Sequence, residues 1–222
     1  MASTATTVAK TFASFAPTVI SKPRRGDEPK LDCKNSDCYT GVMFTHMNHA
    51  NKVSETDTHV FFLNQPFSQW TPSIFTEVLL GEERTFNCAE QYMMASKAAV
   101  FEDYRIFEEI MKVEQERSWQ AAPKRCKELG REITPFDEDK WNNVAQEIVL
   151  QGNLAKFIQN PDMAAILLAT GDKELVEGAH YDKIWGVGLA WDDPRIIDPK
   201  NWRGTNWLGR VLMQVRDTLN GF

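Results

Sequence analysis

The 222-residue chain has no apolar run approaching the roughly 20 residues that a membrane-spanning helix needs. It has only four cysteines, which is typical of a reducing compartment and not of a disulfide scaffold. It contains no internal repeat and no low-complexity block. The formal charge of −6 argues against tight, charge-driven binding of long nucleic acid, although a basic pocket is compatible with it. What is present, 42% hydrophobic residues with seven Trp and thirteen Phe, is enough for one globular core without a membrane segment.

Acidic residues are also missing from the first 26 positions, which are rich in Ser, Thr and Ala. Val8, Phe12, Phe15 and Val19 would line one side of a helix there, a pattern that weakly resembles an organelle transit peptide. The same composition is typical of a disordered terminus. We therefore expect residues 1–57 to be a flexible extension, with organelle targeting as the alternative to a cytoplasmic or nuclear location.

A candidate metal site lies within this extension. Cys33, Cys38, His46 and His49 are residue types that bind zinc. Their spacing departs from that of common zinc fingers, so free thiols are the alternative. We predict no metal centre and no cofactor.

Beyond residue 57 the hydrophobic pattern is mainly helical. Helical segments are expected near residues 88–102, 103–116, 118–129, 138–158, 162–169 and 206–219, and β-strands near 58–63 and 184–190. Val144, Ile148, Leu154 and Phe157 form much of one apolar helix face. The sequence therefore predicts one mainly helical α+β domain over residues 58–222, with a small sheet.

An acid and an amine stand seven residues apart in the first of these helices, Glu90 and Lys97. Seven residues is almost two turns, so both side chains lie on one face. Together they can exchange protons and attack a carbonyl-like carbon. The alternative is structural: Asn87 as N-cap with Glu90 three residues later makes a capping box, and Lys97 is then a solvated lysine.

The C-terminal third offers two further features. Asp182 precedes Trp185 by three residues, and Gly186 follows; the Trp can stack on a nucleobase or cover a ribose, or it is a core residue beside a turn. Asn206 can cap the last helix, whose free N–H groups, with Arg210 nearby, would attract phosphate. Because no strand–Gly-x-Gly-x-x-Gly–helix unit is present, a dinucleotide-binding fold is not expected.

Several motifs together resemble the NADAR (YbiA-like) family. The family's signature helix is matched in this chain by the segment Asn87-Cys-Ala-Glu-Gln-Tyr-Met-Met-Ala-Ser-Lys97. The other matching segments, in the family's order, are Phe62-Leu-Asn-x-x-Phe-Ser68, Trp141, Ala155-Lys-Phe157, Leu168-Ala-Thr-Gly-Asp172, Leu175-Val-Glu177, Asp182-x-x-Trp-Gly186, Trp202-x-Gly-x-Asn-x-Leu-Gly209, Leu212-Met213 and Arg216. The resemblance covers roughly Val60 to Leu219.

The resemblance implies an N-glycosidase that cleaves the bond between a phosphorylated ribose and an exocyclic base nitrogen. We expect ADP-ribosylated guanine, presented as a single base by a nucleic acid, to be the preferred substrate; ribosylamino-pyrimidine phosphates of the riboflavin pathway are the alternative. A module that binds ADP-ribose or a nucleotide without catalysis is the alternative from another class. Glu90 is expected as general acid/base, Asp182 as an electrostatic or water-positioning acid, and Lys97 as an ammonium or an imine-forming amine. The expected pocket residues are Asn64, Phe67, Asn87, Tyr92, Trp141, Lys156, Trp185, Gly186, Asn206 and Arg210.

Overall fold

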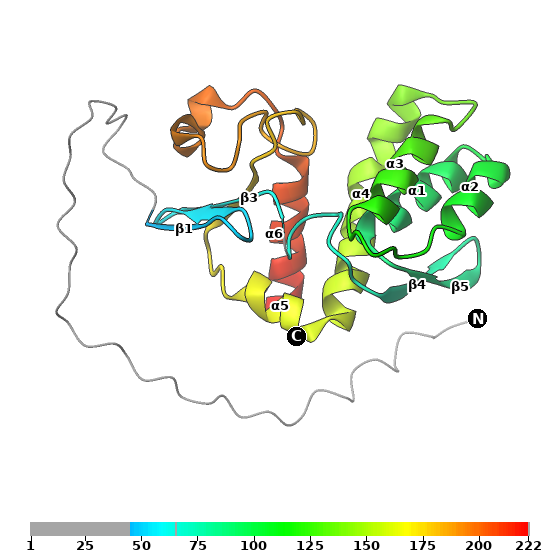
Figure 1. Cartoon of the computed structure of the whole chain (residues 1–222), viewed down its shortest axis with the longest axis horizontal. Helices are drawn as coiled ribbons and strands as arrows, with labels where there is room; N and C mark the ends of the chain where they lie inside the picture. Colours follow the sequence, from blue (N-terminus) through cyan, green and yellow to red (C-terminus); the bar gives the residue numbers. More distant parts are fainter. Residues whose placement is uncertain (1–44, 65, 222) are drawn as a thin grey trace. The chain divides into compact units, whose positions relative to one another are not determined.

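The computed structural model describes residues 45–64 and 66–221, which belong to a compact unit spanning Cys38–Phe222 (Figure 1). Most of the predicted extension, with Cys33 and Cys38 of the candidate zinc site, lies outside these residues. His46 is exposed, and the His49 ring packs edge-on against Trp191 with 5.3 Å between ring centres. Within the described ranges no three His, Cys, Asp or Glu side chains are grouped to hold a metal ion. No helix there is long and apolar enough to cross a membrane.

A four-stranded sheet has the order β1-β2-β3-β6, with β1 (His46–Asn48), β2 (Val53–Glu55), β3 (His59–Phe62) and β6 (Glu174–Glu177). The first three strands are antiparallel neighbours, and β3 pairs in parallel with β6, Phe62 lying opposite Glu177. The strand predicted at 58–63 is confirmed as β3. The strand predicted at 184–190 is wrong, because that segment forms turns, with Gly188 at φ +70°. The parallel partner of β3 is β6 instead.

A separate two-stranded hairpin, β4 (Phe75–Leu79) and β5 (Glu82–Phe86), precedes the first helix. Its turn residues Leu80 and Gly81 have φ of 57° and 79°. Two successive positive φ values match the twist of a tight hairpin. The hairpin was not predicted, and it delivers the chain directly to the start of α1.

All six predicted helical segments are confirmed: α1 (Ala89–Val100), α2 (Tyr104–Met111), α3 (Ala121–Arg131), α4 (Glu138–Gln159), α5 (Pro161–Leu168) and α6 (Trp207–Asn220). Figure 1 shows α1, α2 and α3 gathered on one side of α4, while α6 lies beside the four-stranded sheet. α4 packs against both α1 and α6 and so joins the two groups. The fold is mainly helical α+β, as predicted.

The main core lies where these helices meet the sheet. Phe157 is fully buried on α4, and Val144, Ile148 and Leu154 pack half-buried against the same core, which confirms the predicted apolar face. A second, smaller core forms behind the sheet around Phe61, with residues of the loop after β6. Because β3 and β6 are fixed between these cores, the loops that leave their carboxyl ends start from rigid positions.

Candidate active site

A cleft of about 750 Å³ opens at the carboxyl ends of the parallel strands β3 and β6. Leu63 and Asn64 follow β3, Glu177 ends β6, and all three line the cleft. Helices α1 and α3 supply the facing walls. Ligands commonly bind outside the carboxyl ends of parallel strands, where successive loops diverge. The position in the fold therefore makes this cleft the candidate site.

Helix α1 presents Glu90, Met93, Met94 and Lys97 to the cleft. The predicted common face of Glu90 and Lys97 is confirmed by this placement. The capping box is wrong: the N-cap is Cys88, and no side chain caps the helix. The Asn87 side chain instead donates to the Val113 carbonyl oxygen at 2.8 Å. The Glu90 carboxyl group is thus not engaged in helix capping.

Glu90 is only 6% exposed. Burial raises the pKa of its carboxyl group to about 7; Lys127 opposes the shift, Asp182 adds to it, and a hydrogen bond from the Trp70 side chain opposes it. An acid with a pKa near the working pH can both give and take a proton. The environment of Glu90 therefore suits general acid–base chemistry.

Lys97 lies at the other end of the α1 face. Its Nζ donates to the Gly130 carbonyl oxygen at 2.9 Å and lies 4.3 Å from the centre of the Phe136 ring and 5.7 Å from that of Trp141. Burial lowers the pKa of this amine, and the nearby Arg131 lowers it further. Desolvation and a neighbouring cation are the conditions that make a lysine nucleophilic, whereas the aromatic rings favour its cationic form.

Asp182 organises the loop that follows β6. Its Oδ1 accepts hydrogen bonds from the backbone N–H groups of Ile184 at 2.9 Å and Trp185 at 2.8 Å. Trp185 lines the cleft and packs edge-on against Trp207. A Cβ atom on Gly186 would lie 2.9 Å from the Glu177 carbonyl oxygen, so the close approach of these two backbones requires glycine here.

Helix α3 forms a basic wall that the sequence analysis did not identify. Lys124, Lys127 and Arg131 line the cleft from positions three and then four residues apart, which places them on one face of the helix. None of the three forms an ion pair with another described residue. The Lys127 Nζ lies 5.8 Å from the centre of the Trp70 ring. The spacing was visible in the sequence, but it does not distinguish a cleft wall from a solvated surface.

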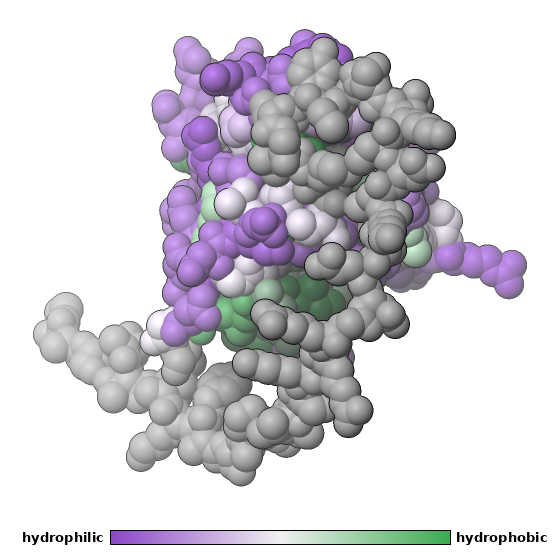
Figure 2. All heavy atoms as spheres, turned by 90° about the vertical axis from the view of Figure 1, so that its left-hand side faces the viewer, coloured by the Kyte–Doolittle hydropathy of each residue, from purple (hydrophilic) through white to green (hydrophobic). Residues whose placement is uncertain are grey.

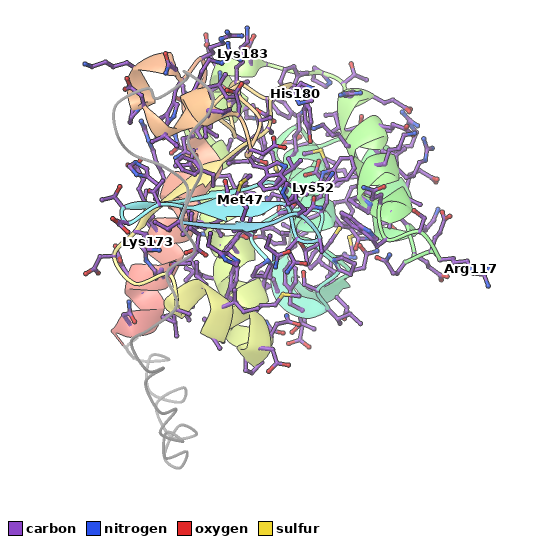
Figure 3. All side chains as sticks on the ribbon, turned by 60° about the vertical axis from the view of Figure 1, so that its left-hand side comes forward. Met47, Lys52, Arg117, Lys173, His180 and Lys183 are labelled. Carbon is purple, nitrogen blue, oxygen red and sulfur yellow. The ribbon has the colours of Figure 1, made fainter. Side chains whose placement is uncertain are left out.

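Other residues of the cleft were also missed as site residues. Glu177 was noted only within a motif, and Tyr181 and Trp70 were not considered, yet all three line the cleft. Figure 3 shows Lys52 at the end of the β1–β2 hairpin and His180 in the loop that follows β6; both contribute to the same lining. These residues come from three segments that are distant in the sequence, at 52, 70 and 177–181, so no single local pattern brings them together.

Of the predicted pocket residues, Asn64, Trp141 and Trp185 line the cleft together with the three predicted catalytic residues. The others do not. Phe67 lines a separate hollow of about 430 Å³ between the β1–β2 strands and α5. Figure 2, which looks onto the side that carries β1, shows hydrophobic surface within a mostly hydrophilic face. Arg210 is exposed on α6.

The remaining predicted residues support the site from behind. The Tyr92 ring packs in the core against Phe86. The fully buried Lys156 donates from Nζ to the carbonyl oxygens of Pro66 at 2.8 Å and Ser68 at 2.9 Å, which fastens the loop that carries Trp70. Asn206 occupies the N-cap position of α6, but its side chain bonds the β6 backbone instead of capping the helix.

Comparison with known proteins agrees with this architecture. A family model described as "NADAR domain" matches residues 59–220. The chain belongs to the NADAR family. An N-glycosidase of Acanthamoeba polyphaga mimivirus is 43% identical over 174 residues, covering 73% of this chain and 97% of the viral protein. The NMR structure of Escherichia coli YbiA superposes with a TM-score of 0.56 at 27% identity, covering 74% of this chain and 86% of YbiA.

A third relative has a different kind of name. A riboflavin biosynthesis protein of Vibrio vulnificus is 34% identical over 131 residues, covering 59% of this chain and 30% of the Vibrio protein. The mimivirus relative, and the Escherichia coli sequence of YbiA, are named N-glycosidases. The family of this chain is thus one of glycosyl-bond hydrolases.

Proposed function

We propose that this chain is an N-glycosidase that hydrolyses the bond between a phosphorylated ribose and an exocyclic base nitrogen, and that its preferred substrate is ADP-ribosylated guanine. The observation that carries the proposal is the buried Glu90 carboxyl group, with a pKa of about 7, in a cleft that also holds Lys97 and Asp182. Hydrolysis of an N-glycosidic bond needs a proton for the leaving nitrogen and negative charge near the anomeric carbon. Glu90 can supply the proton, and Asp182 can supply the negative charge.

The other wall suits the phosphate groups. Five cationic side chains (Lys52, Lys97, Lys124, Lys127 and Arg131) and four acidic ones (Glu90, Glu128, Glu177 and Asp182) line the cleft. Cationic side chains therefore outnumber acidic ones in the lining, although the chain as a whole carries a charge of −6. Unpaired lysine and arginine groups are typical phosphate ligands. We assign the phosphates of the substrate to α3 and the ribose to the acids opposite.

The base is assigned to the aromatic side chains. Trp70 and Trp185 line the cleft next to the acidic residues, and the half-buried Trp119 lines it near α3. Aromatic rings accept any base by stacking, at about 1–3 kcal/mol for each base. A single guanine lifted out of a nucleic acid can be held in this way without extensive backbone contacts, which fits the acidic net charge.

In the proposed reaction, protonated Glu90 gives its proton to the leaving base nitrogen as the bond from ribose C1 to that nitrogen breaks. Asp182 contributes negative charge that stabilises the positive charge developing at C1. Either water attacks C1 directly, or the Lys97 amine bonds to C1 first and water then releases it. In both cases ionised Glu90 takes a proton from the attacking water, so the enzyme returns to its starting state.

The test is incubation of the purified protein with an oligonucleotide that carries ADP-ribose on guanine, followed by mass spectrometry. The expected result is release of ADP-ribose and recovery of unmodified guanine. A parallel reaction contains the ribosylamino-pyrimidine phosphate of the riboflavin pathway. Absence of cleavage in both reactions would contradict the proposal and favour a nucleotide-binding module.

The second candidate is removal of riboflavin-pathway intermediates, and the name of the Vibrio relative favours it. Both substrates attach ribose to an exocyclic nitrogen next to a pyrimidine ring, so the same acids would act on either. The two differ in the number of phosphates. Cleavage of the pyrimidine alone would select this second function.

A further inference from the structure

Of the four carboxyl groups that line the cleft, those of Glu90, Glu177 and Asp182 interact electrostatically, and they differ in their hydrogen bonds. Asp182 has an oxygen occupied by backbone N–H groups of its own loop. Glu90 receives a hydrogen bond from the Trp70 side chain. The Oε2 atom of Glu177 is buried and has no hydrogen-bond partner among the described residues. A buried polar atom without a partner is costly, typically by about 1–3 kcal/mol. Glu177 is therefore the acid in this group whose bonding capacity is left for something else.

The backbone of Glu177 is held rigidly. Its N–H donates to the Asn206 Oδ1 at 3.0 Å, its carbonyl oxygen accepts from the Val187 N–H at 3.0 Å, and it pairs with Phe62 of β3. A side chain that projects from such a fixed strand end into a cleft is well placed for substrate contact. No structural partner within the described residues explains the free oxygen.

We propose that Glu177 is a second substrate-facing acid, which binds the ribose hydroxyl group next to the anomeric carbon through its free carboxyl oxygen. The inference rests on the proposed function, since it assigns a residue to the ribose of that substrate. It also divides the work between the acids: Glu90 exchanges protons with the leaving base, Glu177 holds the sugar, and Asp182 shapes the loop and adds negative charge.

The electrostatic surroundings of Glu177 support this division. Burial raises the pKa of its carboxyl group to about 8; Asp182 of the same loop raises it further, Lys127 of α3 opposes the rise, and Glu90 of α1 adds to it. At neutral pH a carboxyl group of this kind carries a proton and can donate a hydrogen bond to a hydroxyl oxygen. The charge of Glu90 is among the groups that disfavour ionisation of Glu177, so Glu177 keeps its proton more firmly once Glu90 has given up its own.

The first test compares a ribosyl substrate with its 2-deoxyribosyl analogue. The quantity compared is kcat/KM for the ribosyl substrate divided by kcat/KM for the 2-deoxyribosyl analogue. We expect this ratio to be lower in Glu177→Ala than in wild type by on the order of 10-fold or more, the size of a hydrogen bond to a charged or strongly polar group. Glu174→Gln is the matched control, because Glu174 lies on the same strand, outside the cleft, in an ion pair with His59. An unchanged ratio in Glu177→Ala would overturn the inference while leaving the proposed function standing.

The same comparison without turnover separates the two hypotheses. Ribose 5-phosphate and 2-deoxyribose 5-phosphate are titrated into wild type, Glu177→Ala and Glu174→Gln at millimolar concentration and followed by NMR. Preference for the ribose form in wild type and the control, lost in Glu177→Ala, supports the inference even if no substrate is cleaved. Absence of that preference in wild type overturns it.

A second variant guards against misfolding of Glu177→Ala. Glu177→Gln keeps the shape and, like a protonated carboxyl group, can donate a hydrogen bond, so it should retain most of the preference for the ribosyl substrate that Glu177→Ala loses. The charged groups that bear on Glu90, namely Asp182, Lys127 and Arg131, are unchanged in this variant, so the pH profile of kcat should stay in place. A purely structural role for Glu177 would lower the melting temperature of Glu177→Ala without changing its preference for the ribosyl substrate, and that result would count against the inference.

Discussion

The side chain of Asn206 joins the start of α6 to the end of β6, because its Oδ1 accepts from the Glu177 backbone N–H at 3.0 Å. Its Nδ2 donates to the Leu175 carbonyl oxygen at 2.9 Å. Asn206 is 2% exposed and has a left-handed backbone, with φ of 53°. Asn tolerates this conformation better than most residues. Its side chain makes hydrogen bonds to the β6 backbone that a neighbouring strand would otherwise make. Asn206 thus links the helix and the strand that position Glu177.

Asn206→Ala should lower the free energy of unfolding by about 2–4 kcal/mol, because two buried backbone groups lose their partners and alanine is strained at positive φ. The measurement is denaturant unfolding at equilibrium. Asn206→Gly is the matched control, since glycine loses the same hydrogen bonds but adopts positive φ freely. If the two variants are equally stable, backbone strain is not part of the effect; if both match wild type, the strand–helix link is unimportant.

The helices, and the shared face of Glu90 and Lys97 on α1, were predictable because their signals are local. The 3.6-residue period located all six helices, and a seven-residue spacing was sufficient to place Glu90 and Lys97 on one side of α1. Short strands have no comparable signal. β6 contains four residues and is a strand because β3 lies beside it, and the expected strand at 184–190 is instead folded into turns around Asp182.

Residues whose role depends on distant partners could not be identified from the sequence. Lys127 and Arg131 resemble any solvated helix face until the cleft opposite them is known. Lys156 was expected in the pocket, but it is fully buried and bonds backbone carbonyl groups about 90 residues away. Lysine is almost never fully buried, so its sequence context gives no hint of such a placement.

Lys156 should make stability rise at alkaline pH. Burial lowers the pKa of its amine from 10.5 to about 7, so between these values the unfolded chain binds more protons than the folded one. Unfolding free energy therefore increases with pH across that window, by on the order of 3–5 kcal/mol for this group. Lys156→Met should flatten the rise, measured by urea unfolding at pH 7 and pH 9.5.

The control for Lys156 is Lys140→Met, which removes an exposed lysine that also donates to a carbonyl oxygen, that of Val100. This variant should keep the wild-type slope of stability against pH. Equal slopes in all three proteins would mean that Lys156 stays charged in the folded state.

Glu90→Gln should leave the fold intact and reduce turnover by on the order of 10²-fold or more, the scale of lost acid–base catalysis. The reason is that glutamine keeps the shape but cannot give or take the proton. Initial rates and thermal melting are measured together, with Glu174→Gln as the control. A variant that melts several degrees lower yet works normally would restore the structural explanation of Glu90.

The buried Glu90 should also make stability fall as pH rises. Its folded pKa of about 7 exceeds the ordinary value of 4.5, so its favourable contribution is complete below pH 4.5 and is lost as the pH rises through 7. The full difference is about 3 kcal/mol. In Glu90→Gln this loss should disappear, so the variant becomes more stable than wild type at pH 8 relative to pH 5. Parallel stability curves for the two proteins would show that Glu90 is ionised in the folded protein at both pH values.

Lys97 is expected to act as a nucleophile, because burial and Arg131 both lower the pKa of its amine and so increase the fraction of neutral amine. In this reaction Nζ bonds to ribose C1 as the base leaves and the ring opens to an imine, which water then hydrolyses. Lys97→Arg keeps the charge but cannot form the imine, and should lose at least about 10²-fold in turnover. Borohydride added during turnover should reduce the imine and leave a ribose-containing adduct on the peptide with Lys97, detected by mass spectrometry, whereas Lys127→Arg should still give the adduct. Near-normal turnover of Lys97→Arg, without any adduct in wild type, would assign Lys97 the role of a fixed positive charge.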